Sequence, residues 1–479
     1  MGSGDTIVAV ATPPGRGGVA VVRVSGPAVP TIAVALLGAL PAPRHATFSR
    51  WHEAATQPSA AAPGAGALID IGLALYFPAP HSFTGEHVLE LQGHGGDVVV
   101  AALVERIVGL GARRARAGEF SERAYLNDKI DLAQAEAIAD LINAGSRRAA
   151  QAAMRSLQGE FSQAVNATRA ALTSLRVYVE AAIDFPEEEI DFLGSQELRE
   201  RLEYVQKLMR DVLHAAEQGA VLTRGLVVAI AGRPNAGKST LMNRLAGHDV
   251  AIVTPVAGTT RDLLRERIEI DGVPVELIDT AGLRDARDDR DLTSDAIEIE
   301  GMRRAREAIA RADHLLFVVD AAADPEAQSY TAECGVLPEA AHITLVMNKS
   351  DLAPQAAQSS QPAAGTPPRI SISASTGQGL PELRAHIVAA AGQGSGAAGG
   401  GPGVAEADTG TFSARARHVE ALRRGAHHLN FAQQQLKAKQ GELAALELRE
   451  AQRALGEVVG DVSSDELLGH IFGSFCIGK

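Results

Sequence analysis

Residues 232–239 read Gly-Arg-Pro-Asn-Ala-Gly-Lys-Ser, and this stretch decides the fold because it fits the phosphate-binding pattern G-x-x-x-x-G-K-[ST]. The apolar, β-branched run 226–231 before it predicts a buried strand, and residues 239–245 after it predict the first turns of a helix. In such a turn, backbone N–H groups and the helix N-terminus attract phosphate oxygens. We therefore expect the Lys238 ammonium group to reach the β- and γ-phosphates of a nucleotide and the Ser239 hydroxyl group to ligate Mg²⁺.

A second motif indicates where the γ-phosphate and its metal ion lie. Asp279-Thr280-Ala281-Gly282 follows the apolar run 275–278 and fits the D-x-x-G motif of GTPases. We expect Asp279 to reach Mg²⁺ through a water molecule and the Gly282 N–H group to sense the γ-phosphate. Between the two motifs, residues 258–262 read Gly-Thr-Thr-Arg-Asp and offer Thr260 as the switch threonine that ligates Mg²⁺.

Two later motifs indicate that the base of the nucleotide is guanine. Asn348-Lys349-Ser350-Asp351 fits N-K-x-D. The Asp351 carboxylate can accept hydrogen bonds from the N1–H and the exocyclic amine of guanine. Adenine lacks this donor pair and would leave the carboxylate unpaired. Ser373-Ala374-Ser375 fits the last guanine loop, usually S-A-K; its third residue departs, but the base contact comes from the Ala374 backbone N–H group. Because each motif ends a predicted strand, we expect a Ras-like P-loop GTPase domain with a mostly parallel sheet.

Composition narrows the class of protein. The chain has 479 residues, which allows about three domains. Its two cysteines, Cys334 and Cys476, lie far apart, so no disulfide framework is expected. The sequence contains no apolar run of the ~20 residues that a membrane helix needs and opens on no signal peptide, so we expect a cytoplasmic protein without membrane contact. The net charge of −13 means that any contact with nucleic acid depends on a local patch or a partner.

Patterns along the chain predict several segments. Short β-rich runs at 19–24, 68–77 and 87–91 indicate an N-terminal α+β domain. Apolar residues then recur at helical spacing on both sides of the GTPase segment, so we expect that segment to be inserted into one helical domain. The predicted limits are 1–127 for the N-terminal domain, 128–222 and 412–479 for the two parts of the helical domain, 223–392 for the GTPase domain and 393–411 for a Gly-rich linker.

Several segments outside the nucleotide motifs resemble the MnmE (TrmE) family of GTPases that modify uridine in tRNA. The resemblance runs from residue 5 to the last residue, and the Cys-Ile-Gly-Lys ending together with a GTPase loop is specific to that family. The matching segments are Asp5-Thr6-Ile7-Val8-Ala9, Ala11-Thr12-Pro13-Pro14-Gly15-Arg16-Gly17-Gly18, Gly118-Glu119-Phe120-Ser121-Glu122-Arg123-Ala124, Asp131-Leu132-Ala133-Gln134-Ala135-Glu136-Ala137 and Phe475-Cys476-Ile477-Gly478-Lys479.

This resemblance implies a homodimer that forms a heterotetramer with an MnmG-like, FAD- and NADH-dependent partner. In that family the two proteins install an aminomethyl or carboxymethylaminomethyl group on C5 of the wobble uridine of certain tRNAs. The N-terminal domain is implied to hold the dimer together and to bind the one-carbon donor, 5-formyl- or 5,10-methylenetetrahydrofolate. The residues that match the family's folate positions are Arg23, Glu90, Lys129 and Lys479. Without the resemblance, Arg23 is interpreted as a solvated strand residue.

The water that attacks GTP needs a group to position it. Leu283 follows D-x-x-G, and it cannot orient this water as the Gln of many GTPases does. The sequence shows no arginine finger either, and such a cation is worth roughly 10³–10⁵ in rate. The resemblance implies that K⁺ takes this part, bound by Asn235, by the backbone carbonyl groups of Thr254 and Val256, and by Thr259. Taken alone, Asn235 is better explained as a turn-forming residue.

Glu298 aligns with the family's catalytic glutamate, which orients the hydrolytic water through a second water. The charged segment 285–294 is longer than the family pattern, so Glu300 is a second candidate, although the spacing to Gly301 favours Glu298. The resemblance implies that Cys476 lies near the folate pocket. Two interpretations of Cys476 are equally open, a catalytic residue and an inert buried thiol. The predicted GTP-binding residues are Asn235, Ala236, Gly237, Lys238, Ser239, Thr240, Thr254, Pro255, Val256, Ala257, Gly258, Thr259, Thr260, Asp279, Thr280, Ala281, Gly282, Asn348, Lys349, Ser350, Asp351, Ser373, Ala374 and Ser375.

Two other classes of GTPase share the nucleotide motifs. A ribosome-assembly GTPase acting as a binding switch would carry basic RNA-binding appendages, whereas the flanks here are acidic or neutral. A membrane-remodelling GTPase would need an apolar or polybasic insertion, which the sequence lacks. We therefore expect a K⁺-dependent GTPase of tRNA modification, with the ribosome-assembly switch as the alternative.

Overall fold

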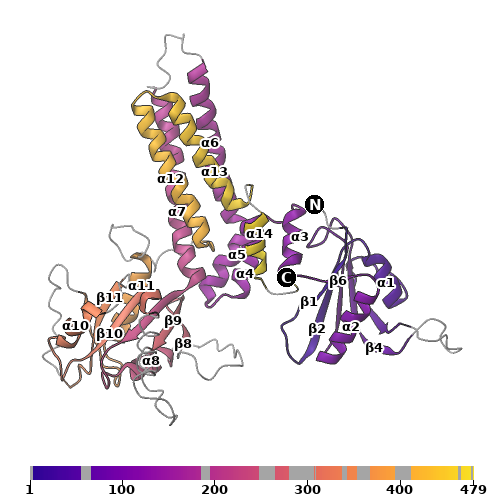
Figure 1. Ribbon diagram of the computed structural model, residues 1–479, viewed down its shortest axis with the longest axis horizontal. Helices are drawn as coiled ribbons and strands as arrows, with labels where there is room; N and C mark the ends of the chain where they lie inside the picture. Colours follow the sequence, from indigo (N-terminus) through magenta and orange to yellow (C-terminus); the bar gives the residue numbers. More distant parts are fainter. Residues whose placement is uncertain are drawn as a thin grey trace. The chain divides into compact units, whose positions relative to one another are not determined.

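The computed structural model describes residues 4–54, 66–184, 195–247, 265–279, 307, 309–336, 342–352, 367–393, 411–461, 465–475 and 478. The chain forms two compact units, residues 1–139 with 456–479 and residues 140–455. Figure 1 shows a sheet in the first unit, and a helical bundle and another sheet in the second. The first unit therefore joins the two ends of the sequence.

The first unit is built on a six-stranded sheet covered by two helices. These elements span Ile7–Val10 (β1), Gly17–Ser25 (β2), Val29–Leu37 (α1), Thr47–His52 (β3), Leu68–Phe77 (β4), Val88–Gly95 (β5), Asp97–Gly109 (α2) and Arg113–Arg114 (β6). The strand order is β3-β4-β5-β2-β1-β6, and only β1 and β6 pair in parallel. Helices α1 and α2 cover one face, where Trp51, Leu91 and Ile107 are fully buried. The predicted α+β domain is confirmed.

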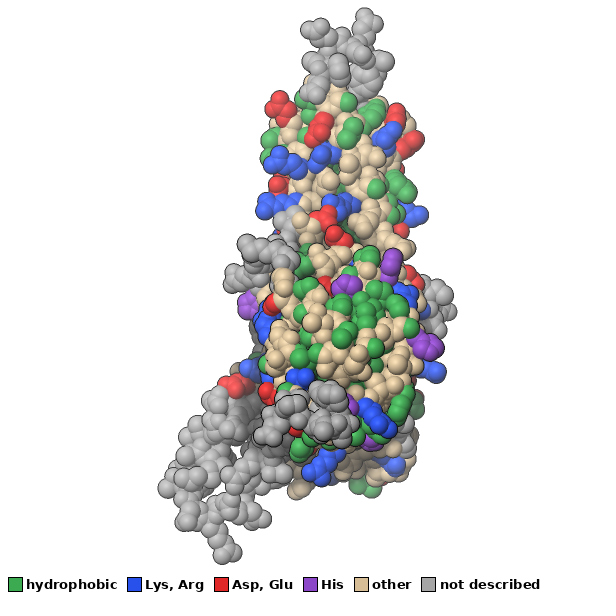
Figure 2. Space-filling view, turned by 90° about the vertical axis from the view of Figure 1, so that its right-hand side faces the viewer, with side chains coloured by type: hydrophobic (Ala, Val, Ile, Leu, Met, Phe, Trp, Pro, Cys, Tyr) green, Lys and Arg blue, Asp and Glu red, His purple; other side chains and the backbone are tan. Residues whose placement is uncertain are grey.

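The opposite face of this sheet is partly apolar. Phe48 and Leu73 lie opposite each other on β3 and β4, and Ile71 lies two residues before Leu73 on the same face. The exposed fractions of Phe48, Leu73 and Ile71 are 66%, 39% and 37%. Figure 2 shows hydrophobic side chains gathered in the middle of the side turned toward the viewer. Exposed apolar area of this kind is typical of an interaction surface.

Helix α3 (Glu119–Leu126) inserts two opposite charges into the interior of the first unit. The side chains of Arg123 and Glu119 are only 5% and 2% exposed. Arg123 donates to Glu119 Oε1 at 3.2 Å, to Asp5 Oδ1 at 2.8 Å and to Glu86 Oε2 at 3.0 Å, and Arg113 also pairs with Glu119. Burial alone would raise the pKa of Glu119, but hydrogen bonds from these arginines and a backbone N–H group outweigh it and lower the pKa to about 2.

The end of the chain packs into the same unit. Helix α14 (Asp465–Gly473) contacts α3 and shares an apolar cluster with the start of α4 (Leu132–Ile142). Phe472 of α14 is buried, and its ring centroid lies 6.2 Å from that of Tyr125. A Cβ atom on Gly478 would lie 2.2 Å from the carbonyl oxygen of Val10, so the penultimate residue of the sequence lies against β1.

Helices from both sides of the GTPase segment form one bundle in the second unit. They are α5 (Arg147–Leu157), α6 (Glu160–Asp184), α7 (Gln196–Arg224), α12 (Ala416–Lys437) and α13 (Gly441–Val459). The buried residues of α7 recur every three or four positions from Leu198 to Leu222, which gives it one apolar face. Ser195 caps α7 by accepting the Leu198 N–H group. Figure 1 shows α7 beside α12, which follows the GTPase segment in the sequence, so the predicted insertion is confirmed.

The inserted segment forms a second six-stranded sheet, in the order β12-β11-β10-β7-β9-β8. All neighbours are parallel except β8 and β9. Val228, Leu277 and Leu316 are fully buried in its core, as their apolar runs predict. The elements are Leu226–Ala231 (β7), Lys238–Ala246 (α8), Arg265–Ile270 (β8), Val273–Asp279 (β9), His314–Asp320 (β10), Gln328–Glu333 (α10), His342–Asn348 (β11), Arg369–Ser371 (β12) and Leu380–Gln393 (α11). The mostly parallel sheet of the predicted fold class is confirmed.

Within the described ranges, no helix is both long enough and apolar enough to span a membrane. The predicted cytoplasmic location and the predicted limits of the domains stay predictions.

Candidate functional site

The phosphate-binding loop joins β7 to α8 at the carboxyl ends of the parallel strands. Its backbone is left-handed at Gly232, Asn235 and Gly237, where φ is 137°, 63° and 94°. A Cβ atom on Gly237 would lie 2.2 Å from the amide nitrogen of Asn348, so the loop approaches that side chain too closely for a larger residue. The glycines of the motif are therefore required by the path of the loop.

Lys238 and Ser239 begin helix α8 beside this loop. The Lys238 side chain is buried, and its ammonium group donates to the carbonyl oxygen of Arg233 at 2.8 Å. Ser239 and Thr240 are exposed at the helix N-terminus. A helix N-terminus with a lysine beside it is suited to hold phosphate groups. The loop has the strand-to-helix geometry that its motif predicts, and its contact with a nucleotide stays a prediction.

Asn348, the last residue of β11, joins three parts of the site. Its Nδ2 atom donates to the carbonyl oxygen of Ala236 at 2.8 Å, and its Oδ1 atom accepts the Ala374 N–H group at 3.0 Å. The buried amide thereby ties the phosphate loop to the loop after β12. Since the Ala374 N–H group already donates to Asn348, its predicted bond to guanine would have to compete with this one.

Lys349, the next residue, pairs with a side chain that no sequence motif includes. Its ammonium group lies 2.6 Å from Asp320 Oδ2, at the carboxyl end of β10. Asp320 Oδ1 also accepts the N–H groups of Ala322 and Ala323, at 3.1 and 3.3 Å. Burial alone would raise the pKa of Asp320, but the bond from Lys349 and the two backbone bonds outweigh it and lower that pKa. Asp351, the predicted guanine acceptor, is exposed.

Arg244 on α8 also supports the guanine loop and is absent from every motif. Its guanidinium group donates to the carbonyl oxygens of Ala374 and Ser375, at 3.2 and 2.7 Å. The Ser373 and Ser375 hydroxyl oxygens lie 3.0 Å apart within the same loop. A single arginine within a helix gives no local signal of such a role, because its partners lie far away in the sequence.

Part of the predicted site lies outside the described residues. Asp279 ends β9 opposite Ile230 of β7, which brings its backbone next to the phosphate loop. Its side chain is not among those described. Other predicted site residues lie entirely outside the described residues. They are Thr254, Pro255, Val256, Ala257, Gly258, Thr259, Thr260, Thr280, Ala281, Gly282, Glu298, Cys476 and Lys479. The roles of these residues stay predictions.

Two of the residues at the implied folate positions form an ion pair across β2 and β5. Arg23 and Glu90 are directly opposite in register, and Arg23 Nε and Nη2 lie 2.9 and 2.8 Å from Glu90 Oε1. Only 24% and 19% of their side chains are exposed. The Arg23 guanidinium carbon lies 5.9 Å from the centroid of the Phe83 ring, which is partly exposed. The interpretation of Arg23 as a solvated strand residue is therefore wrong.

Lys129 lies near the loop that carries Phe83. A Cβ atom on Gly85 would lie 3.0 Å from Cε of Lys129, so the exposed lysine side chain runs along this loop. Lys129 also lines a cavity of about 480 Å³ together with Tyr125 and Gly460. Three of the four implied folate residues are thus described, and all three belong to the first unit.

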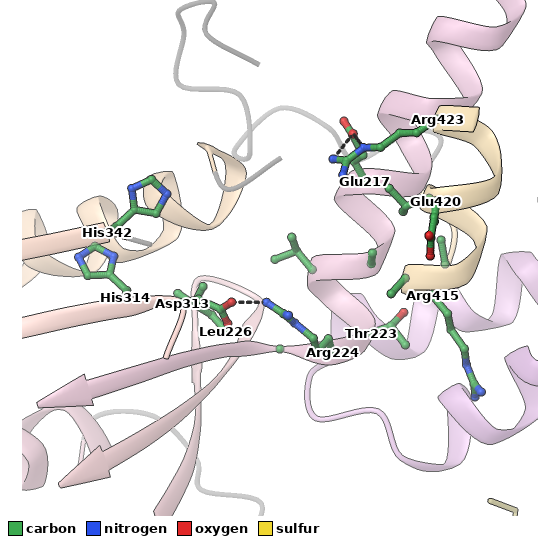
Figure 3. Close-up of a pocket in the computed structure, with 16 residues that line it drawn as sticks. Glu217, Thr223, Arg224, Leu226, Asp313, His314, His342, Arg415, Glu420 and Arg423 are labelled. Carbon is green, nitrogen blue, oxygen red and sulfur yellow. Dashed lines mark hydrogen bonds and ion pairs between the residues drawn. The ribbon is translucent and has the colours of Figure 1, made fainter. Parts of the chain in front are cut away.

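A larger cavity of about 820 Å³ lies within the second unit, between α7, α12 and the amino ends of β7 and β10. Figure 3 shows two oppositely charged pairs on its wall, Arg224 with Asp313 and Arg423 with Glu217. The phosphate loop lies at the opposite ends of these strands. Among the described residues, none of those predicted to bind the nucleotide lines this cavity.

His314, on the wall of this cavity, is a buried histidine. Its Nε2 atom lies 2.8 Å from the Thr344 hydroxyl oxygen, which lies 2.9 Å from Nε2 of His386. Burial first, and then the neighbouring His386 and His342, lower the pKa of His314 from 6.5 to about 4. His314 is therefore neutral in the folded chain at pH 7.

We expect the free energy of unfolding to fall between pH 6.5 and 4, because the unfolded chain binds a proton at His314 in this range and the folded chain does not. The pKa shift corresponds to a loss of about 3 kcal/mol once the pH is below both pKa values. Urea unfolding at several pH values measures it. His314→Gln should remove this part of the pH dependence while keeping a partner for Thr344; an unchanged pH profile in the variant would contradict the assignment.

Comparisons with known proteins identify the family. Residues 132–476 match the family model described as the MnmE helical domain, and residues 6–129 match that of the GTP-binding protein TrmE N-terminus. The tRNA modification GTPase MnmE of Chromohalobacter salexigens is 51% identical over 479 residues, which covers 99% of this chain and 98% of that protein. The protein of the same name from Stutzerimonas stutzeri is 52% identical over 480 residues, which covers 99% of each.

Solved structures resemble a smaller part of the chain. The structure of Era in complex with MgGDPNP and nucleotides of 16S ribosomal RNA is 26% identical, covers 34% of this chain and 55% of that one, and has a TM-score of 0.25. A likeness this limited carries no argument about function. The two family models and the relatives that match over their whole length do decide the family. The chain belongs to the MnmE family of tRNA modification GTPases.

Proposed function

We propose that this chain is a K⁺-dependent GTPase that, with an FAD-dependent MnmG-like partner, forms the 5-carboxymethylaminomethyl or aminomethyl group on the wobble uridine of certain tRNAs. A tetrahydrofolate derivative donates the one-carbon unit. The observation that carries the proposal is the likeness to tRNA modification GTPases over the whole chain. The same likeness favours this function over the alternative of a ribosome-assembly switch.

The phosphate loop carries side chains of the kinds that GTP hydrolysis requires. In the reaction a water oxygen bonds to the γ-phosphorus, the bond to the β–γ bridging oxygen breaks, and GDP leaves. The Lys238 ammonium group balances charge on the phosphates, and Asp351 accepts the guanine N–H groups. The exposed Ser239 hydroxyl and Asn235 amide are hard oxygen donors, which suit Mg²⁺ and K⁺ respectively. Thr260 completes the proposed Mg²⁺ ligands, and both cations when bound neutralise charge that develops on the phosphate oxygens.

The cation requirement is tested by comparing GTP turnover in K⁺ and in Na⁺ at equal ionic strength. We expect turnover to be much faster in K⁺, because Leu283 cannot position the water and a well-placed cation is worth roughly 10³–10⁵ in rate. ATP should be hydrolysed far more slowly than GTP. Equal rates in the two salts would remove K⁺ from the proposal, and equal rates with the two nucleotides would remove the guanine site.

We also propose that two copies of the chain associate through the N-terminal domain. The exposed apolar face with Phe48, Ile71 and Leu73 supports this, since such a face is costly to leave in water. Light scattering of the purified chain measures the mass in solution. A monomeric mass, with and without GTP and K⁺, would contradict the dimer.

The mostly buried Arg23–Glu90 pair beside the Phe83 ring supports a folate site. A pterin offers an amine and a ring N–H group to a carboxylate, and its flat ring can stack on an aromatic face. The donor, when bound, supplies the carbon atom that is transferred to uridine. We expect Lys129 and the terminal Lys479 to attract the glutamate tail of the folate.

Glu90→Ala is expected to weaken binding of 5-formyltetrahydrofolate by tenfold or more. The variant removes a carboxylate acceptor and releases Arg23, and a lost bond to a charged group costs about 1.5–3 kcal/mol. Calorimetric titration measures the affinity. GTP turnover should survive, because Glu90 and the phosphate loop belong to different units.

Glu105→Ala is the matched control for this titration. Glu105 lies on α2 of the same unit and is 64% exposed, where it pairs with Arg114. Its replacement should leave folate affinity unchanged. Wild-type folate affinity in Glu90→Ala would remove this site from the proposal and leave the GTPase function standing.

A further inference from the structure

We propose that Asp320 is a positioning residue for guanine recognition, which acts by holding Lys349 and, through Lys349, the turn that presents Asp351. The inference rests on the proposed guanine site and adds to it a residue outside the nucleotide motifs. Asp320 and Asn348 are partners in register at the ends of the parallel strands β10 and β11. This pairing brings the aspartate next to the first residue of the turn after β11.

The two carboxylate oxygens of Asp320 have separate partners. Oδ1 accepts the N–H groups of Ala322 and Ala323 and so fixes the turn after β10. Oδ2 lies 2.6 Å from the ammonium nitrogen of Lys349. Only 24% of the Asp320 side chain and 33% of the Lys349 side chain are exposed, so water competes less for this pair than for a surface pair. One carboxylate thereby links the ends of two neighbouring strands.

The backbone of Lys349 shows why such a link is needed. Its φ is +63°, in the left-handed region, which residues other than glycine rarely adopt unless their surroundings hold them there. The turn that carries Asp351 starts at this residue, because the Leu352 N–H group donates to the Lys349 carbonyl oxygen at 3.0 Å. Loss of the ion pair would free the Lys349 side chain, and the direction in which the chain runs to Asp351 would then be less well fixed.

Asp324 offers a matched comparison on the same loop. Its Oδ1 and Oδ2 atoms accept the N–H groups of Gln328 and Ser329, each at 2.8 Å, at the start of α10. Both oxygens of Asp324 thus serve backbone capping, whereas one oxygen of Asp320 serves a lysine of the guanine motif. If Asp320 were only a capping residue, changes at the two positions would have the same effect on base recognition.

The test measures the affinities of the full-length chain for GDP and for IDP, by competition with fluorescent mant-GDP. IDP lacks the exocyclic amine of guanine, so the ratio of the two affinities reports how well Asp351 is placed. In Asp320→Asn the amide oxygen can still accept the two backbone N–H groups, but the charged acceptor for Lys349 is lost. We expect GDP to bind about tenfold more weakly, ~1.4 kcal/mol, and IDP to lose less, so that the ratio falls.

Two further variants make the result decisive. Asp324→Asn should leave the ratio at its wild-type value. In a Lys349→Met background, Asp320→Asn should change nothing further, because its partner is already gone. Three outcomes would each overturn the proposal for Asp320 and leave the guanine site intact. The first is an unchanged affinity ratio in Asp320→Asn, and the second is an equal loss of affinity for GDP and IDP. The third is a full additional loss of affinity when Asp320→Asn is added to the Lys349→Met variant. A wild-type chain that binds GDP no better than IDP would instead overturn the guanine site itself.

Discussion

Replacing Glu298 with alanine is expected to lower GTP turnover by roughly 10²–10⁴, with little change in the affinity for GTP. The residue after D-x-x-G is Leu283, so another group must orient the attacking water, and Glu298 is the candidate that the family resemblance provides. A residue that acts only on the water contributes to the transition state and not to binding of the nucleotide. Single-turnover hydrolysis, together with titration of a non-hydrolysable analogue, separates the two quantities.

Glu300→Ala is the control for this experiment, because Glu300 lies two residues away in the same acidic segment. Its effect on turnover should be much smaller. A large effect of Glu300→Ala with a small effect of Glu298→Ala would show that the long segment 285–294 shifts the alignment, and the catalytic role would then move to Glu300.

Arg123→Ala is expected to lower the free energy of unfolding by about 3–5 kcal/mol, because it removes the buried cation that the buried carboxylate of Glu119 shares with Glu86 and Asp5. Glu119 is only 2% exposed, and Glu86 and Asp5 bind the same guanidinium group. Arg114→Ala is the matched control. Arg114 and its partner Glu105 are both 64% exposed, so the loss of this surface pair should cost about 1 kcal/mol or less. Urea unfolding of the two variants measures the difference, and equal effects would contradict the account.

The same network sets a pH dependence. The folded pKa of Glu119, about 2, lies below its ordinary value of 4.5. Its contribution to stability is therefore complete above pH 4.5 and is lost as the pH falls toward 2, since the unfolded chain takes up the proton first. This range overlaps the one in which His314 acts only between about pH 4 and 4.5, so unfolding curves at several pH values separate the two groups.

The parts of the structure that the sequence predicts are those encoded by neighbouring residues. The phosphate loop is one: Gly237 and Lys238 lie within a continuous motif between an apolar strand and a helix, so both its conformation and its place at a strand end follow from local chemistry. The inserted GTPase domain follows in the same way from helical patterns on both of its flanks. Asn348 contacts Ala236 of the phosphate loop and Ala374 of the last guanine loop, and the sequence predicts each of these motifs separately.

The parts that could not be predicted depend on which strands become neighbours. Asp320 reaches Lys349 only because β10 and β11 pair in parallel with their ends aligned, and an aspartate at the end of a strand carries no signal of that by itself. Arg23 and Glu90 meet through the register of β2 and β5, 67 residues apart in the sequence. Arg123 meets Asp5 across 118 residues. Such pairs are set by the tertiary fold, not by local pattern.

The most direct test of the proposed function is nucleoside analysis of tRNA from a strain that lacks this chain. The wobble uridine of the affected tRNAs should lose its 5-carboxymethylaminomethyl or aminomethyl group. Expression of the wild-type chain should restore the group, and the Lys238→Ala variant should not, because its phosphate loop lacks the ammonium group that we propose binds the phosphates of the nucleotide. Unchanged uridine modification in the strain without the chain would contradict the account. If that strain also showed a defect in ribosomal subunits, the result would favour the ribosome-assembly switch.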